Sequence, residues 1–387
     1  MLNEQILTHA KIVTAEQVFT GTVVLRDGVI SEVDDSISQL SQAQNLNGDY
    51  LLPGLVELHT DNLEKHLSPR PGVDWPSASA VMSHDAQIIA AGITTVFDAL
   101  SIGDVNPKGK RMQQLPGMVD AIAKANAADM TRAEHRLHLR CEVCHPDTLS
   151  VFRDLVEQPL VQLVSVMDHS PGQRQFALES KYREYYMGKY HLSIEQMDEF
   201  IVEQVANSKT YSDRYRRAIV DICLARGLSV ASHDDATLAH VEESAAYGMT
   251  IAEFPTTLEA AQGCRRLGMS VLMGAPNIVR GGSHSGNIAA ATLAEEGLLD
   301  ILSSDYYPAS LLQAAFTLGA QLDAADDSTG AGLARAVTTV SLAPARSAGL
   351  HDRGEIRVGL RADLIHARAI GTLPIIQQVW RQAKRVF

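Results

Sequence analysis

A histidine and an aspartate spaced two positions apart, His59 and Asp61, end an apolar run that begins at Leu51. Side chains at positions i and i+2 of a strand share one face, so these two would point the same way. An apolar strand that ends in two potential metal ligands is typical of a barrel strand that opens into a site. The alternative is a buried histidine paired structurally with the aspartate, and this segment alone does not decide between the two.

Comparable side chains end other apolar runs of the chain. They are Glu142, His169, His233, Asp234, Glu253 and Asp305. Imidazole and carboxylate donors together suit Zn²⁺ or another first-row divalent ion, and two ions about 3.5–4 Å apart can ionise a bridging water near neutral pH. The recurrence therefore predicts a metal site where parallel strands end.

Each candidate also has a structural interpretation. We expect His59 and His233 to be ligands rather than core histidines, and Asp305 to be a ligand or a general base. We expect Glu142 to bridge two metal ions and His169 to be a ligand beside it. The alternative is that Glu142 forms a buried salt bridge to a nearby arginine. Three residues could equally lie behind the ligands and orient them: Asp61, Asp234 and Glu253. Four histidines are left as polar residues of the pocket or surface: His66, His84, His191 and His284.

A glycine-rich segment at residues 277–287 could bind an anion. Its Gly-Gly turn lets backbone N–H groups approach a ligand, and the helix expected after it favours negative charge at its start. Arg280 would add a planar, two-pronged donor to this segment. A second glycine-containing loop carries Arg174, and Lys65 is a weaker candidate near His59. For any one of these cations, the alternative is a surface salt bridge.

Apolar runs typical of strands alternate with helical patterns through the middle of the chain. The strand candidates are residues 55–59, 94–99, 137–143, 162–167, 228–232, 250–254, 270–274 and 300–304. The helical candidates include residues 83–91, 117–128, 194–225, 258–267, 287–296 and 309–320. This alternation predicts an α/β fold, a (β/α)8 TIM barrel. A doubly wound open sheet is the alternative, but it would need a glycine-rich dinucleotide turn that the sequence lacks.

Short strand patterns at both ends of the chain predict a second, smaller domain. Residues 6–35 contain strand candidates around an Asp27-Gly28 turn, and residues 354–365 have the same pattern. We therefore expect a small β-sandwich built from residues 1–53 and 346–387, with the barrel at residues 54–345.

The overall charge limits the class of partner. A net charge of −13 disfavours nucleic acid and anionic membranes, so we expect a small-molecule ligand and neither of those partners. No apolar run reaches the roughly 18 residues of a membrane span and no leader pattern opens the chain, which predicts a soluble, cytoplasmic protein. The cysteines at positions 141, 144, 223 and 264 lack zinc-ribbon spacing, and we expect them to be reduced and mostly buried.

Several longer segments resemble a known family. The segments Pro53-Gly-Leu-Val-Glu-Leu-His59 and Ala91-Gly-Ile-Thr-Thr-Val96 resemble the metal-dependent amidohydrolase superfamily, although His-x-Asp replaces its common His-x-His. The full length resembles, more narrowly, the PhnM-type diphosphatases of the bacterial C–P lyase pathway. This resemblance is carried by His59-Thr-Asp-Asn-Leu-Glu-Lys-His66, Met167-Asp-His-Ser-Pro-Gly-Gln-Arg-Gln-Phe176, Ser232-His-Asp-Asp-Ala-Thr237 and residues 69–75, 253–257, 274–286 and 302–308.

The resemblance implies a reaction and a set of roles. The reaction is hydrolysis of α-D-ribose 1-methylphosphonate 5-triphosphate to the 5-phosphate and pyrophosphate. The implied metal set is His59, Asp61, Glu142, His169, His233 and Asp305, with Glu142 as the bridge and Asp305 as proton acceptor. The implied contacts to phosphate or phosphonate are Lys65, Arg174, Arg280 and His284. The ion is expected to be Zn²⁺, one or two per chain, with Mn²⁺ or Fe²⁺ as alternatives, and the chain is expected to form a homo-oligomer.

Two other functions remain open. One is an amidohydrolase that cleaves a C–N bond of a cyclic amide or N-acyl substrate at the same metal site, without a need for several anion-binding loops. The other is a non-catalytic subunit that binds phosphonate metabolites or assembly partners. Residues 173–212, rich in tyrosine and charge, are expected to form either a lid or a partner surface.

Overall fold

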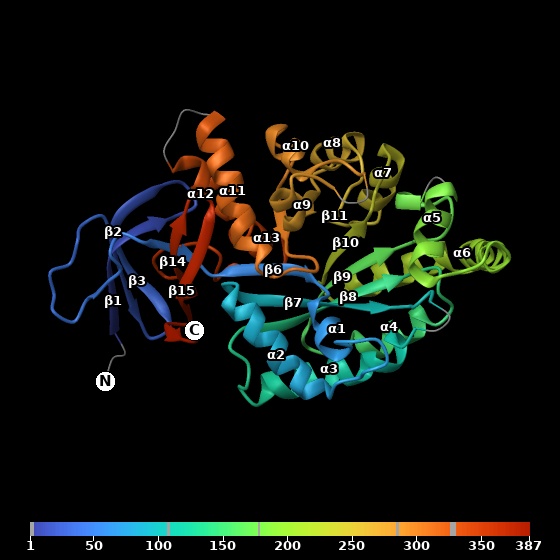
Figure 1. Ribbon diagram of the computed structural model, residues 1–387, viewed down its shortest axis with the longest axis horizontal. Helices are drawn as coiled ribbons and strands as arrows, with labels where there is room; N and C mark the ends of the chain where they lie inside the picture. The colour runs from blue at the N-terminus through green and yellow to red at the C-terminus, as the bar shows by residue number, and fades with distance from the viewer. Residues whose placement is uncertain (1–3, 107–108, 177–178, 284–285, 326–329) are drawn as a thin grey trace.

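The structure, a computed structural model, describes residues 4–106, 109–176, 179–283, 286–325 and 330–387. Two sheets organise it: a parallel sheet of eight strands that curls into a barrel, and a mixed sheet built from both ends of the chain. Figure 1 shows the mixed sheet beside the barrel, with both termini on its side of the molecule. The α/β fold class predicted from the sequence is confirmed.

The barrel strands follow one another along the chain, and each pairs in parallel with the next. They are β6 (Leu55–Thr60), β7 (Ile93–Ile102), β8 (Glu134–Glu142), β9 (Val161–Met167), β10 (Ser229–His233), β11 (Ile251–Glu253), β12 (Ser270–Gly274) and β13 (Ile301–Ser303). A parallel bridge between Thr60 and Asp305 joins the first strand to the residues after the last one and closes the ring. All eight predicted strands are present, because strands buried on both faces are continuous apolar runs.

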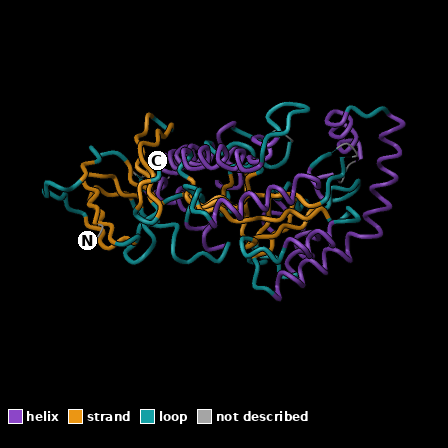
Figure 2. The backbone as a smooth tube through the Cα atoms, turned by 90° about the horizontal axis from the view of Figure 1, so that it is seen from below, coloured by secondary structure: helices purple, strands orange, loops and turns teal. Residues whose placement is uncertain are grey.

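Helices surround the barrel strands, as Figure 2 shows. They are α1 (Asn62–Leu67), α2 (Ser77–Ala90), α3 (Arg111–Ala127), α4 (Thr148–Leu155), α5 (Glu179–Tyr190), α6 (Ile194–Ala225), α7 (Leu238–Ala246), α8 (Leu258–Arg266), α9 (Ala275–Arg280), α10 (Ala290–Glu295), α11 (Ser310–Ala325), α12 (Ala331–Thr338) and α13 (Leu342–Ser347). The largest apolar core lies between helices and strands, and a smaller one, with Leu58, Phe97 and Leu272, fills the barrel interior. Within the described residues, none of these helices is both long and apolar enough to cross a membrane.

The longest helix, α6, has the bounds that the sequence predicted. The Ser193 hydroxyl accepts the Gln196 backbone N–H at 3.2 Å, and the Gln196 side chain accepts the Ser193 N–H at 2.9 Å. This reciprocal cap satisfies N–H groups that have no partner inside the helix and fixes where it begins. Helix α5 precedes it and shares a separate, largely aromatic core with it: Phe176, Tyr182, Tyr186, Met197, Phe200 and Ile201.

One segment near the barrel differs from its prediction. Residues 277–280, expected to open the anion-binding loop, lie in the short helix α9 (Ala275–Arg280) instead. Pro276 suits the first helical turn, and Gly281, with φ of 79°, ends the helix in the left-handed conformation that glycine tolerates. Arg280 is therefore the last residue of a helix, and the Gly-Gly turn follows it.

The mixed sheet unites the two ends of the chain. Its strands are β1 (Glu4–Val13), β2 (Val18–Arg26), β3 (Val29–Asp34), β4 (Gln44–Asn45), β5 (Tyr50–Pro53), β14 (Leu364–Ile370), β15 (Leu373–Arg381) and β16 (Lys384–Arg385). β14 pairs antiparallel with β5, so the N- and C-terminal segments meet in its centre. Leu25 of β2 and Trp380 of β15 share one core, because the sheet wraps around it. The domain boundaries at residues 53 and 345 stay predictions.

Candidate active site

A cavity of about 320 Å³ lies at the carboxyl ends of the barrel strands. Eight residues predicted from the sequence line it: His59, Asp61, Glu142, His169, His233, Asp234, Arg280 and Asp305. His59, Glu142 and His233 stand at the ends of β6, β8 and β10. Because parallel barrel strands all end at one face, residues distant in sequence meet there. All six residues assigned to the metal set are thus brought to one cavity.

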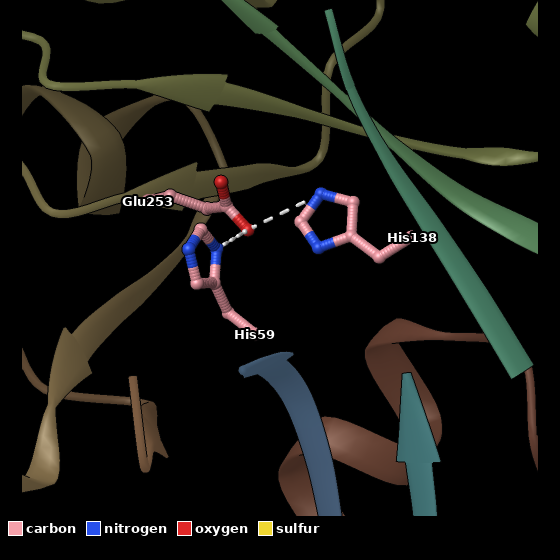
Figure 3. Close-up of side chains that lie close together, drawn as sticks. All are labelled: His59, His138 and Glu253. Atoms are coloured by element: carbon pink, nitrogen blue, oxygen red, sulfur yellow. Dashed lines mark hydrogen bonds and ion pairs between the residues drawn. The ribbon is translucent and has the colours of Figure 1, made fainter. Parts of the chain in front are cut away.

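A single carboxylate holds two of the histidines from behind the cavity. Glu253 Oε1 lies 3.0 Å from Nδ1 of His59, and Oε2 lies 3.1 Å from Nδ1 of His233. With both Nδ1 atoms engaged, the Nε2 atoms are left to face a ligand. Burial acts to raise the pKa of Glu253, but the neighbouring His59 and His138 rings hold that pKa well below its ordinary value. Figure 3 shows His59 and His138 directed at the same Glu253 oxygen.

Glu142 holds a third histidine in a similar way. Its Oε2 lies 2.5 Å from Nδ1 of His169, and its Oε1 accepts the His169 backbone N–H at 2.9 Å. The Nε2 atoms of His169 and His233 lie 3.5 and 3.6 Å from Asp234 Oδ2. Although burial acts to lower it, Glu142 and Asp234 raise the pKa of His169 to about 10. Both Glu142 oxygens contact His169, and the bridging role of Glu142 stays a prediction.

The backbone is strained where three strands end. Asp234, Phe254 and Asp305 adopt positive φ values of 56°, 53° and 53°, a conformation that is uncommon outside glycine and turns the chain sharply. Asp305 is also tied to the first strand: its N–H donates to the His59 carbonyl at 3.1 Å, and its own carbonyl accepts the Thr60 hydroxyl at 2.8 Å. Closure of the barrel therefore places Asp305 beside His59.

The three predicted cations differ in what they reach. Arg280 lines the cavity. Arg174 is buried, and its guanidinium is directed at Asp235 and Glu243. Lys65 donates to a backbone carbonyl at the rim. Neither Arg174 nor Lys65 is among the described residues that line the cavity. Both side chains are engaged by neighbouring residues instead, and the sequence alone did not indicate these contacts.

Helix α5 forms part of the cavity wall. Tyr185, Tyr186, Lys189 and Tyr190 all line it. The Lys189 ammonium lies 5.0 Å from the ring centre of Tyr185 and 5.6 Å from that of Tyr190. A cation stacked on aromatic rings presents a positive charge to a ligand. Part of the segment 173–212, left open between a lid and a partner surface, thus lines the cavity.

The sequence analysis did not predict a buried chain of hydrogen-bonded polar groups beside β6 and β7, the first two barrel strands. His84 Nε2 lies 2.7 Å from one Asp98 oxygen, and His135 Nδ1 lies 2.8 Å from the other. Asn62 extends the chain, with its amide nitrogen 3.1 Å from His84 Nδ1 and 3.4 Å from His66 Nε2. Asp98 could have indicated this chain from the sequence, since a carboxylate within an apolar strand needs a buried partner. His66 therefore belongs to this chain, and His284 lies outside the described residues.

His138 was also missed. One ring nitrogen lies 2.9 Å from the Leu58 carbonyl, and the other lies 2.9 Å from the Ser165 hydroxyl. Burial lowers the pKa of His138 to about 3, so its ring is neutral and donates to the carbonyl. Its ring centre lies 5.3 Å from that of His59, which it supports from below the cavity. The spacing of His138 and Glu142 on one face of β8 could have indicated it.

Comparison with known proteins decides the family. No family model matches the chain. A protein of Escherichia coli (strain K12), alpha-D-ribose 1-methylphosphonate 5-triphosphate diphosphatase, is 53% identical over 382 residues, which cover 99% of this chain and 100% of that protein. The chain belongs to this diphosphatase family. The resemblance found in the sequence motifs is thereby confirmed.

Solved structures share the fold of this diphosphatase family member at low identity. The 5-methylcytosine deaminase of Klebsiella pneumoniae has a TM-score of 0.63 and 14% identity, with 99% of this chain and 97% of that chain covered. An adenosine deaminase of Xanthomonas campestris with bound zinc has a TM-score of 0.61 and 15% identity, with coverage of 98% and 92%. The N-acetyl-D-glucosamine-6-phosphate deacetylase of Mycobacterium smegmatis has a TM-score of 0.63 and 15% identity, with 99% of this chain and 100% of that chain covered. At these identities the likeness establishes the fold alone.

Proposed function

We propose that the chain hydrolyses α-D-ribose 1-methylphosphonate 5-triphosphate to the 5-phosphate and pyrophosphate. The observation that carries this proposal is the 53% identity, over 99% of the chain, to a diphosphatase named for that substrate. The cavity is compatible with it, because side chains suited to divalent ions lie beside the guanidinium groups of Arg140 and Arg280. Cleavage of a C–N bond, the alternative, is supported only by fold likeness at 14–15% identity.

The donor set fits a divalent metal, which we propose to be Zn²⁺, with Mn²⁺ or Fe²⁺ as alternatives. Histidine Nε2 atoms and carboxylates converge on the cavity, and Asp61 Oδ1 is buried with no hydrogen-bond partner among the described residues. A buried carboxylate oxygen without a partner is costly, and a cation held there would remove that cost. When bound, divalent ions would supply a water that ionises near neutral pH and a clamp for phosphate oxygens.

The side chains of the cavity divide the remaining work. His59, His169 and His233 would hold the metal through Nε2, with Asp61 and Asp305 as carboxylate donors. Asp305, fixed beside the first strand, would accept the proton of the attacking water. Arg280 and Lys189 would bind phosphate or phosphonate oxygens from two parts of the wall. Arg174 and Lys65, predicted to contact substrate, are better placed to hold neighbouring residues.

The reaction can be tested with ribose 1-methylphosphonate 5-triphosphate in ¹⁸O-labelled water, followed by phosphorus NMR on protein of known metal content. Label in the sugar 5-phosphate and none in the pyrophosphate is expected for attack at the α-phosphorus. Label in the pyrophosphate would move the attack to the β-phosphorus. No turnover by fully metallated protein would contradict the proposal, and release of ammonia or a carboxylate from C–N substrates would then be assayed.

The role of Asp305 has its own test. Asp305→Asn, compared with wild type at full metal loading, is expected to lower kcat by roughly 10²–10⁴-fold, the usual contribution of a positioned general base. The control is Asp221→Asn, an exposed aspartate on α6 that should leave kcat unchanged. Full turnover by Asp305→Asn with its metals in place would remove the proton-acceptor role.

A further inference from the structure

Arg140 lies on the cavity side of β8, between two residues of the site. Side chains two positions apart on a strand share a face, so His138, Arg140 and Glu142 point the same way. His138 is held by a carbonyl and a hydroxyl, and Glu142 is held by His169. Arg140 thus brings a fixed positive charge to the metal-binding end of the barrel.

The guanidinium of Arg140 makes no hydrogen bond or ion pair within the part of the chain that the structure describes. Its Nε is buried without a hydrogen bond, and no ion pair involves its other nitrogens. Three buried arginines are paired with carboxylates: Arg174 with Asp235 and Glu243, Arg216 with Asp213 and Glu243, and Arg353 with Glu134 and Asp352. Arg140, which is partly buried and has its Nε atom fully buried, differs from these arginines in having no carboxylate paired with it.

This arrangement calls for an anionic ligand. A guanidinium carries five N–H donors and does not lose its proton in proteins, so Arg140 stays charged in the cavity. A buried N–H donor without a partner, such as its Nε, is costly. A metal held by the neighbouring histidines would repel it, unless an anion lay between the two. The missing partner is thus a group with several negative oxygens that can contact the metal and Arg140 at once.

We propose that Arg140 is a catalytic residue that binds the phosphoryl group under attack; this rests on the proposed function and deepens it. Two N–H groups of the planar fork donate to non-bridging oxygens of the α-phosphoryl group. As the water oxygen bonds to phosphorus, the water proton passes to Asp305 and the anhydride bond breaks, with its electron pair leaving on pyrophosphate. Arg140 forms no covalent bond, and its charge offsets the charge that gathers on the oxygens in the transition state.

The test compares wild type with three variants, and a fourth, Arg140→Ala, serves for rescue by guanidinium ions. Arg140→Met removes the charge and the donors but keeps much of the length, and Arg140→Lys keeps the charge without the fork. The matched control is Arg136→Met on the same strand, because Arg136 is paired with Glu134 at 2.5 Å and is not among the described residues that line the cavity. Each protein is loaded with metal, and metal content, kcat and KM for the triphosphate, and calorimetric binding of inorganic pyrophosphate are measured.

We expect Arg140→Met to lower kcat by about 100-fold or more, as loss of one preorganised donor to a transition state does, with metal content unchanged. Binding of pyrophosphate should weaken by roughly tenfold, because a charge-assisted contact is lost. Millimolar guanidinium ions should restore part of the activity of Arg140→Ala, a response that a merely structural role would not produce. Arg136→Met should show none of these changes.

The outcomes separate the two proposals. If wild type releases pyrophosphate and Arg140→Met does so with unchanged kcat, the role of Arg140 is overturned and the proposed function stands. If wild type releases none, the proposed function fails, and equal pyrophosphate binding by wild type and Arg140→Met would overturn the anion contact as well. If Arg140→Met does not fold, Arg140→Lys decides: a wild-type kcat overturns the need for the fork, and a kcat about tenfold lower supports it.

Discussion

Glu253 and His59 are 194 residues apart in the chain, yet Oε1 of the first lies 3.0 Å from Nδ1 of the second. They come from β11 and β6, and the same carboxylate holds His233 of β10 through its other oxygen at 3.1 Å. The Glu253 carboxylate on β11 therefore orients two imidazoles, one on β6 and one on β10. A change at this one residue should act on two candidate metal ligands at once.

We expect Glu253→Gln to weaken metal binding by about 10–100-fold, the usual effect of losing a carboxylate behind a ligating histidine. A glutamine side chain has one acceptor, so only one of the two Nδ1–H groups would keep its partner. Zinc affinity measured by competition with a chromophoric chelator checks this. Glu296→Gln, an exposed residue after α10, is the control. An affinity equal to that of wild type would show that the histidines do not need this carboxylate.

Glu142→Gln tests whether Glu142 bridges two ions, as the sequence predicted, or orients His169. Both of its oxygens contact His169, so we expect the variant to keep the metal stoichiometry of wild type with lower affinity. Elemental analysis after dialysis against a fixed free-zinc concentration measures the stoichiometry. Loss of one full equivalent of metal would instead support the bridge.

The barrel was predictable from the sequence because its strands are apolar runs that alternate with helical patterns, and several of these runs end in a polar residue. His59, His233 and Asp305 could be proposed as site residues for the same reason, since fold geometry sends the ends of parallel strands to one face. The α6 helix was predictable from its periodicity and its Ser193 cap.

Which side chains pair with which could not be predicted. Arg174 was expected to reach substrate, but it is engaged by Asp235, which follows β10, and by Glu243 of α7, and the approach of these elements to Arg174 depends on tertiary packing. Asp98 was overlooked because its partners lie on other elements, with His135 on the adjacent strand. A single sequence shows that a buried charge needs a partner, but not where the partner lies.

Metal uptake should release protons, with a pH dependence set by His169. Glu142 and Asp234 raise the pKa of this imidazole to about 10, and a metal binds only the neutral ring. Between pH 6.5 and 9 the metal-free ring is protonated, so apparent affinity should rise with pH by up to about tenfold per unit from this residue. Zinc titrations at several pH values measure the slope. In Glu142→Gln the pKa should fall and the slope should flatten; an identical slope would contradict this origin.

Glu134 ties the start of β8 to the C-terminal segment, and its substitution should destabilise the fold. Its Oε2 accepts from Arg353 at 2.8 Å and from Arg361 at 2.6 Å, and its Oε1 accepts from Arg136. Burial acts to raise the pKa of Glu134, but these arginines lower it from 4.5 to about 2. A carboxylate with a lowered pKa contributes stability that is present above about pH 4.5 and is lost as the pH falls through 2.

We therefore expect Glu134→Gln to lose on the order of 3 kcal/mol of unfolding free energy at pH 7, because two buried guanidinium groups lose their shared partner. Urea unfolding of both proteins, followed by circular dichroism from pH 7 to pH 3, measures the difference. It should shrink below pH 4.5, because Glu134 of the unfolded wild-type chain takes up a proton there while the folded protein keeps the carboxylate ionised. Asp120→Asn removes an exposed pair with Lys124 and should cost less than about 1 kcal/mol. A difference that stays constant down to pH 3 would show that the ionised carboxylate is not what joins β8 to the C-terminal segment.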